Sequence, residues 1–215
     1  MYIKKFLAIL MFTFCFSVNS LESAPPESSP KKWPCDQVYN PKLDLKAVWS
    51  GPQIDGFKKN WWKDDEVIEM VNKLSDPILS EDEGTRIIED FAKKHSYFGL
   101  VKKKERNTKL INIFVGLFEK ASQKRNKQYE GIIKFVERQD VIRKTIGDAS
   151  KELRKYRKAG LDVKDPKFTE AEAKMKWNTR VFDQRTRLTE YVCEEPVFLE
   201  QRIGYQARKI LTYLQ

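Results

Sequence analysis

The chain has 215 residues and a mixed, basic charge, with 41 Lys and Arg against 31 Asp and Glu. Its length allows one large domain. Positive and negative residues are interleaved along the chain, which is typical of a solvated helical surface and argues against a nucleic-acid partner. Because His95 is the only histidine, the chain alone cannot supply a Cys/His zinc cage, and catalytic triads that use histidine are not expected.

Residues 1–20 have the layout of a secretory signal peptide. Lys4 and Lys5 precede an apolar run from Phe6 to Val18, and small or polar residues follow it. This run is shorter than the roughly 20 residues that a lasting membrane anchor needs. We expect cleavage after Ser20 and export of the mature protein to the periplasm. A cut nearer Ala24 and an uncleaved, membrane-tethered form are the alternatives.

Residues 21–34 are rich in proline and serine and predict a flexible leader, and residues 35–215 predict a single helical domain. Once Cys15 leaves with the signal peptide, Cys35 and Cys193 are the two cysteines that remain. In an oxidising compartment such a pair tends to form a disulfide. The closed loop of more than 150 residues is worth roughly 5 kcal/mol in the chain-entropy model. The bond would pin an N-terminal strap to the helical body.

Two short helices are predicted after one helical turn at residues 44–49. Asp64 is the expected N-cap of the first, which ends at Asp76-Pro77. Ser80 and Glu83 form a capping box that begins the second, and Gly99 closes the pair. A charged linker, residues 101–107, is then expected.

The longest periodic stretch begins at Asn107 or Thr108 and ends at Gly160. Its apolar residues recur at alternating steps of three and four, which predicts a heptad seam. Gly131 and Gly147 weaken this helix. A second capping box, Thr169 and Glu172, predicts the start of a return helix that Pro196 divides into residues 169–194 and 196–214. The predicted fold is all-α, a long antiparallel helical hairpin with two shorter helices and a disulfide-stapled N-terminal strap.

Four polar residues occupy positions of the two helices where aliphatic side chains would pack better: Arg125, Gln128, Gln139 and Arg185. Polar residues in a seam either set its register or mark where it is exposed. We expect exposure of this side of the seam to a partner.

The tryptophans gather in the N-terminal part of the chain, at Trp33, Trp49, Trp61 and Trp62. Large rings help a short strap and a short helix to bury area against the body, which is the expected role. The alternative is an aromatic surface that binds carbohydrate or peptide.

No catalytic or cofactor motif stands out. The chain has no glycine-rich phosphate loop and no Gly-x-Ser-x-Gly elbow, so no cofactor is expected. The acidic residues 80–85 lack alternating oxygen ligands, and starting a helix accounts for them, so no metal is expected. Carboxylates are plentiful, and a pair of them that acts as in glycosidases stays an alternative.

The strings "PCDQ", "VWSGP", "WNTRVFDQR" and "YVCEEPVFLEQR" resemble those of uncharacterised exported helical proteins of Gram-negative bacteria. The resemblance covers most of the mature chain and implies no particular activity. We expect an exported, non-enzymatic helical interaction protein of the cell envelope, an adaptor, scaffold or chaperone-like module that binds a protein partner or itself. A binder of an anionic envelope polymer or lipid surface and a carboxylate-based hydrolase are the alternatives.

Overall fold

The computed structural model describes residues 33–58, 60–96 and 99–214, and within these ranges the chain is mostly helical and has no β-strand. The predicted signal peptide and most of the predicted leader lie outside the described residues. The elements are α1 Leu45–Val48, the 3-10 helix η1 Trp61–Lys63, α2 Asp65–Leu74, α3 Glu81–Lys94, α4 Gly99–Lys158, α5 Pro166–Arg187 and α6 Thr189–Leu214.

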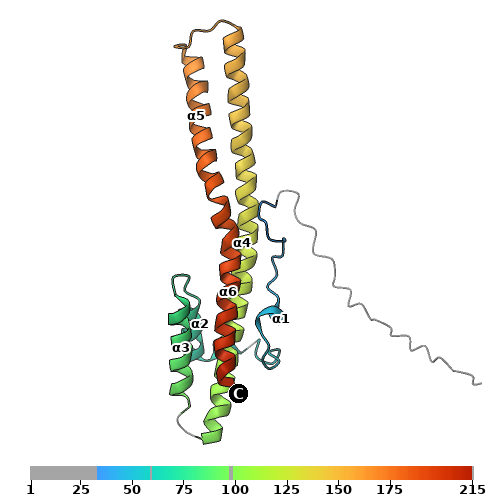
Figure 1. The fold of residues 1–215 in the computed structure, drawn as a ribbon, viewed down its shortest axis with the longest axis vertical. Helices are drawn as coiled ribbons and strands as arrows, with labels where there is room; N and C mark the ends of the chain where they lie inside the picture. Colours follow the sequence, from blue (N-terminus) through green and yellow to red (C-terminus); the bar gives the residue numbers. More distant parts are fainter. Residues whose placement is uncertain (1–32, 59, 97–98, 215) are drawn as a thin grey trace, which may run out of the picture.

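The molecule is a rod built on α4, whose 60 residues extend about 90 Å at 1.5 Å per residue. The chain turns at Gly160, which has a φ of +69°, and returns along α4 first as α5 and then as α6 (Figure 1). Helices α2 and α3 flank the lower half of the rod, and α1 lies on its other side (Figure 1). None of the described helices is long and apolar enough to cross a membrane.

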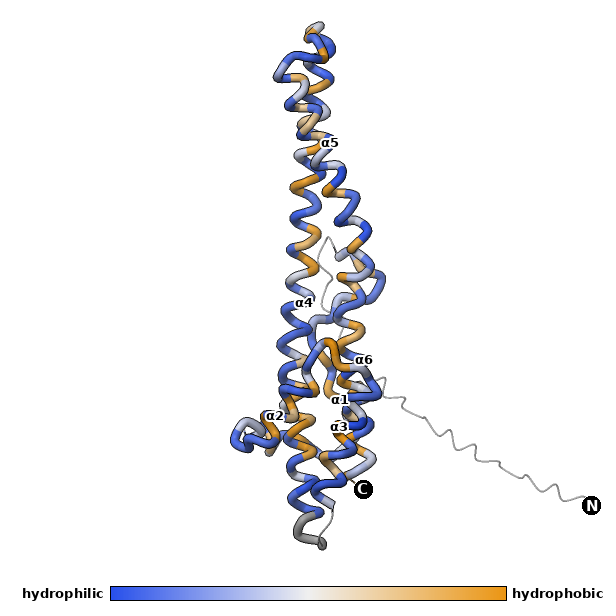
Figure 2. Tube along the Cα trace, turned by 90° about the vertical axis from the view of Figure 1, so that its left-hand side faces the viewer, coloured by the Kyte–Doolittle hydropathy of each residue, from blue (hydrophilic) through white to orange (hydrophobic). Residues whose placement is uncertain are grey.

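The heptad seam predicted for α4 is confirmed, because every one of its positions from Ile111 to Tyr156 is buried or half-buried. Hydrophilic and hydrophobic residues alternate along both arms of the rod (Figure 2). Two paired helices produce this pattern when each buries an apolar stripe and leaves its polar face in water.

The main core lies in the lower half of the rod, where four helices meet. It contains Val67, Val71 and Leu74 of α2, Ile88, Phe91 and Ala92 of α3, the segment from Leu110 to Leu117 of α4, and Ile203, Ala207 and Ile210 of α6. Helix α4 comes so close here that a Cβ atom on Gly116 would lie 2.6 Å from Val71. A smaller cluster of Leu153, Phe168 and Ala171 closes the far end of the hairpin.

The helix starts signalled by Asp64 and Ser80 are confirmed. The Asp64 carboxylate accepts from the amides of Glu66 and Val67, and Ser80 and Glu83 form both halves of the predicted capping box.

Three predicted boundaries are wrong. Residues 101–107 are not a linker, because α4 already begins at Gly99 and the Lys, Glu and Arg that follow are good helix formers. Helix α5 begins at Pro166 with Asp165 as its N-cap, so Thr169 lies inside the helix, where its hydroxyl donates to the carbonyls of Asp165 and Pro166. Proline fits a first helical turn, since its missing N–H would have no partner there.

The return arm breaks at Leu188 and not at Pro196. The amide of Leu188 donates to Arg185, three residues back, which tightens the last turn of α5. Helix α6 then begins at Thr189 and runs through Pro196. Proline removes one amide donor from a helix, and here contacts from elsewhere in the chain support the helix around it.

Candidate interaction surface

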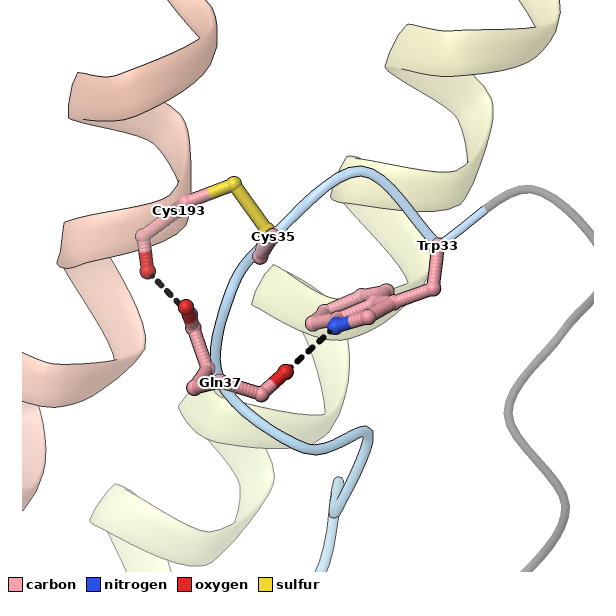
Figure 3. Close-up of a disulfide and its surroundings, with 4 residues drawn as sticks. All are labelled: Trp33, Cys35, Gln37 and Cys193. Atoms are coloured by element: carbon pink, nitrogen blue, oxygen red, sulfur yellow. Dashed lines mark hydrogen bonds between the residues drawn. A yellow bond between two sulfur atoms is a disulfide. The ribbon is translucent and has the colours of Figure 1, made fainter.

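The predicted disulfide between Cys35 and Cys193 is present, with Cα atoms 5.5 Å apart and a separation of 158 positions in sequence. Two hydrogen bonds surround it (Figure 3). The Gln37 amide donates to the carbonyl of Cys193 over 2.6 Å, and the Trp33 indole donates to the carbonyl of Gln37 over 2.7 Å. The side chain of Gln37 thus bonds the helix carbonyl of Cys193, next to the Val192 carbonyl that has no amide donor at Pro196.

Arg125 joins three parts of the chain at the same level of the rod. It is 6% exposed, and its guanidinium donates to the carbonyls of Asn40 and Pro196, to the Glu200 carboxylate over 2.9 Å and to the Tyr129 hydroxyl. One side chain of α4 therefore holds both the N-terminal segment and α6. The planar guanidinium suits this role because it carries five donors in a fixed geometry.

The other polar seam residues also bond within the chain. Gln139 is buried, donates to the Thr186 hydroxyl and accepts from Arg185, whose guanidinium also donates to the carbonyl of Phe135. The expectation that these polar positions are exposed is therefore wrong for Arg125 and Gln139. Polar groups at these positions pair the two arms of the hairpin, which is the register role of polar seam residues.

The four tryptophans are spread along the rod. Trp33 stacks on Tyr129, and Trp49 stacks on Phe114, fifteen positions earlier in α4 and so about 22 Å away along its axis. The Trp61 indole donates to Glu119 over 2.7 Å. Trp62 is 47% exposed. Three of the rings fasten the N-terminal segment and η1 to α4, and a binding role for the four stays a prediction.

A cluster of charges joins α2, α3 and α4 near His95. Glu66 accepts from Lys109 over 2.7 Å and from Lys94 over 3.0 Å, and lies 3.1 Å from the His95 ring. Burial works against ionisation of Glu66, but the two lysines and the histidine outweigh it and lower the pKa of this carboxyl to about 2. The cluster fastens α2, α3 and α4 together.

A surface hollow of about 510 Å³ lies between α4, α6 and the turn that joins α2 to α3. A second hollow of about 410 Å³ continues it along α4. Gln128 and Glu195 line both, so we treat the two as one feature and call it the α4–α6 groove. Its walls include Ile78, Lys124, Tyr191, Phe198, Arg202 and Tyr205 in the first hollow and Gly131, Phe135, Arg138, Arg185 and Val192 in the second.

Large apolar side chains stay exposed beside this groove. Ile78 is 89% exposed, Tyr191 is 59% exposed and Phe198 is 50% exposed. Because Tyr191 and Phe198 are seven residues apart, they lie on one face of α6. The sequence prediction missed these three residues. The spacing of Tyr191 and Phe198, beside the buried stripe of α6, could have indicated two of them.

The groove also holds polar atoms without partners. Among the described residues, three buried side-chain oxygens have no hydrogen bond, and two of them line the first hollow: Oε1 of Gln128 and the hydroxyl of Tyr205. Burial raises the pKa of Tyr205, so this hydroxyl keeps its proton and needs an acceptor. A surface with exposed apolar rings and unpaired buried polar atoms is suited to binding.

Comparison with known proteins finds no family model, no curated protein and no solved structure that matches this chain.

Proposed function

We propose that this chain is an exported, non-enzymatic helical interaction protein of the cell envelope, which binds a protein partner as an adaptor, scaffold or chaperone-like module. The observation that supports this most is the run of exposed apolar side chains beside the α4–α6 groove. Contiguous exposed apolar surface on a folded chain usually marks an interaction site. The disulfide fits an oxidising compartment outside the cytoplasm.

We further propose that residues 33–42 act as a strap across the hairpin. Its supports are the disulfide, the stacking of Trp33 on Tyr129 and the bond from Arg125 to Asn40. A strap held at these three places keeps α4 and α6 in one register beside the groove. A fixed register is what a binding surface made from two helices needs.

Site-specific photo-crosslinking in the producing cell tests this function. A photoreactive residue at position 198, beside the groove, is expected to form an adduct with one defined protein of the envelope. The same residue at position 177, where Trp177 is 64% exposed on α5, is the matched control and is expected to form none. If the exported protein purifies without a specific partner and position 198 crosslinks to no protein, the proposal is wrong.

A second candidate function is binding to an anionic polymer or lipid surface. Residues 143–180, the free end of the hairpin, contain twelve Lys and Arg against six Asp and Glu. This end therefore holds a net charge of +6, more than half of that of the chain. Co-sedimentation with anionic vesicles that is lost in high salt, and that is absent with neutral vesicles, would favour this candidate.

A further inference from the structure

The α4–α6 groove has the dimensions of a helix-binding groove. It follows α4 from Lys124 to Arg138, fourteen positions or about 21 Å, which is the length of a four-turn helix. The residues of α4 that line it are Lys124, Gln128, Gly131, Ile132, Lys134, Phe135 and Arg138. Gln128, Ile132 and Phe135 belong to the heptad seam of α4, and Lys124, Gly131, Lys134 and Arg138 are exposed positions beside it. The groove thus runs along the edge of this seam.

Gly131 leaves room for a third helix midway along the part of α4 that lines the groove. A Cβ atom built on Gly131 would meet nothing within 4 Å, and the residue is exposed. Small residues let helix backbones approach closely. Phe135 and Phe198 line the groove on either side of this point and offer apolar contacts.

The unpaired polar atoms specify what the occupant must supply. Tyr205 is only 9% exposed, and its hydroxyl requires an acceptor, whereas Oε1 of Gln128 requires a donor. Glu81 and Arg202 lie near the Tyr205 hydroxyl, and neither satisfies it with a hydrogen bond of good geometry. An amide side chain carries both a donor and an acceptor, and a polar residue at one seam position fixes register in helix pairs. The occupant is therefore expected to present Asn or Gln to this part of the groove.

The charges along the groove favour an acidic occupant. Five cations line it, Lys124, Lys134, Arg138, Arg185 and Arg202, against the two carboxylates of Glu81 and Glu195. Lys124, Lys134 and Arg138 form no ion pair within the described part of the chain, and Arg202 donates to the carbonyls of Asp76 and Pro77. Cations without carboxylate partners at the edge of an apolar groove attract and orient an anionic ligand.

We propose that the α4–α6 groove binds an acidic amphipathic helix of a protein partner, laid along α4 and α6 as a third helix. This inference rests on the proposed function and names the partner's chemistry. A second copy of this chain is disfavoured as the occupant, since its acidic helices α2 and α3 already bury their apolar faces in the core. The basic surface of α4 in a second copy would also bring like charges together.

Defined peptides test this inference on the full mature, oxidised chain. The probe is a fluorescent 18-residue peptide with Leu at the seam positions, one central Asn at a seam position and Glu elsewhere. A peptide with Lys in place of Glu, and one with the Leu positions scrambled, are the controls. Fluorescence anisotropy is expected to show binding of the acidic peptide at least tenfold tighter than either control, and weaker binding as salt rises.

Variants of exposed residues locate the binding. Phe198→Asp and the double variant Lys124→Glu with Arg138→Glu are each expected to weaken binding of the acidic peptide at least tenfold. The matched controls, Trp177→Asp and Lys144→Glu with Lys151→Glu, change exposed residues outside the groove and are expected to leave it unchanged. Circular dichroism should show native helix content in all four variants.

Three outcomes would overturn the inference. In the first, the acidic peptide binds no better than its controls, and in the second, the groove variants bind it as well as the wild type does. In the third, Phe198→Asp leaves peptide binding unchanged and abolishes self-association or vesicle binding. Any of these, together with a protein adduct at position 198 in cells, refutes the acidic-helix partner and leaves the proposed function standing. Absence of any adduct in cells counts against the proposed function itself, whatever the peptide does.

Discussion

Arg125 is the buried charged side chain on which the junction of α4, α6 and the N-terminal segment depends. Its replacement by Met keeps the apolar stem and removes every donor, so the carbonyls of Asn40 and Pro196 and the Tyr129 hydroxyl lose their partner. Each buried group left unpaired costs about 1–3 kcal/mol. We expect Arg125→Met to lower the free energy of unfolding by about 3 kcal/mol, measured by urea denaturation followed by circular dichroism.

Glu200→Gln is the control for this prediction, because it removes only the carboxylate of the same ion pair. The Glu200 side chain is 42% exposed, and solvent screens its charge. Its loss should cost about 1 kcal/mol or less. Equal losses for the two variants would show that Arg125 acts only through the ion pair.

Glu66 gives the fold a dependence on acid pH. Its pKa is about 2 in the folded chain, below the ordinary value of 4.5, so ionised Glu66 stabilises the fold at pH values above 4.5. This contribution is lost as the pH falls through about 2. After allowance for solvent screening it is worth about 1–2 kcal/mol. The difference in free energy of unfolding between the wild type and Glu66→Gln should therefore be greatest near pH 6 and decrease steadily toward pH 2.

The matched control for this prediction is Glu69→Gln, an exposed residue of the same helix α2. Its difference from the wild type should stay small between pH 6 and pH 2. A Glu66→Gln curve that runs parallel to the wild type over this range would show that the cluster with Lys109, Lys94 and His95 does not favour the ionised carboxylate.

Two glycines of α4 should respond in opposite ways to the same substitution, because one faces a neighbouring helix and the other faces open space. A Cβ on Gly116 would lie 2.6 Å from Val71 and 2.9 Å from Trp61, whereas a Cβ on Gly147 meets nothing within 4 Å. Overpacking costs about 1–3 kcal/mol, and replacing a helical glycine by alanine gains about 1 kcal/mol. We expect Gly116→Ala to destabilise the chain by about 1–2 kcal/mol and Gly147→Ala to stabilise it by up to about 1 kcal/mol, both by urea denaturation.

If Gly116→Ala raised the unfolding midpoint as Gly147→Ala is expected to do, the close approach of α4 to α2 at Gly116 would not hold in solution. Gly160→Ala offers a further check at the turn. Its positive φ strains any side chain, so this variant should destabilise the chain although no neighbour blocks its Cβ.

Local signals in the sequence predicted most of the elements. The capping box of Ser80 and Glu83, the N-cap at Asp64 and the heptad spacing of α4 each depend on residues within a few positions of one another, and all are confirmed. The break at Leu188 could not be predicted, because no glycine or proline marks it. Pro196 was a stronger local signal, but hydrogen bonds from Gln37 and Arg125, far away in sequence, support the helix there.

The candidate site was less predictable than the elements. The sequence pointed to Gln128 as a polar seam residue, but the first hollow of the groove depends on the turn at Ile78, which comes to lie beside α6. That approach depends on contacts between residues more than a hundred positions apart, such as the bonds from Arg202 to Asp76 and Pro77. The cysteine pair was the one long-range contact that composition predicted, since only two cysteines follow the expected signal peptide.

At the scale of the whole molecule, one crosslink opposes the fraying of a long, thin rod. A hairpin arm has neighbours on few sides, so each segment of α4 gains little burial compared with a globular core. The disulfide joins the N-terminal segment to α6 at the level where Arg125 joins both to α4. Covalent and polar contacts are thus concentrated where the return arm passes from α5 to α6.

Reduction of the disulfide should weaken the whole fold and free the N-terminal segment first. Closing a loop of 158 residues is worth roughly 5 kcal/mol in the chain-entropy model, and measured values tend to fall below this. The double variant Cys35→Ser with Cys193→Ser should therefore lose about 3–5 kcal/mol of unfolding free energy relative to the oxidised protein. Hydrogen exchange should rise most in residues 33–42 and around Pro196, and less in the distal cluster of Leu153 and Phe168. Mass spectrometry of the intact protein after alkylation without reductant tests the disulfide itself. Two alkylated thiols in protein taken from outside the cytoplasm would contradict the disulfide.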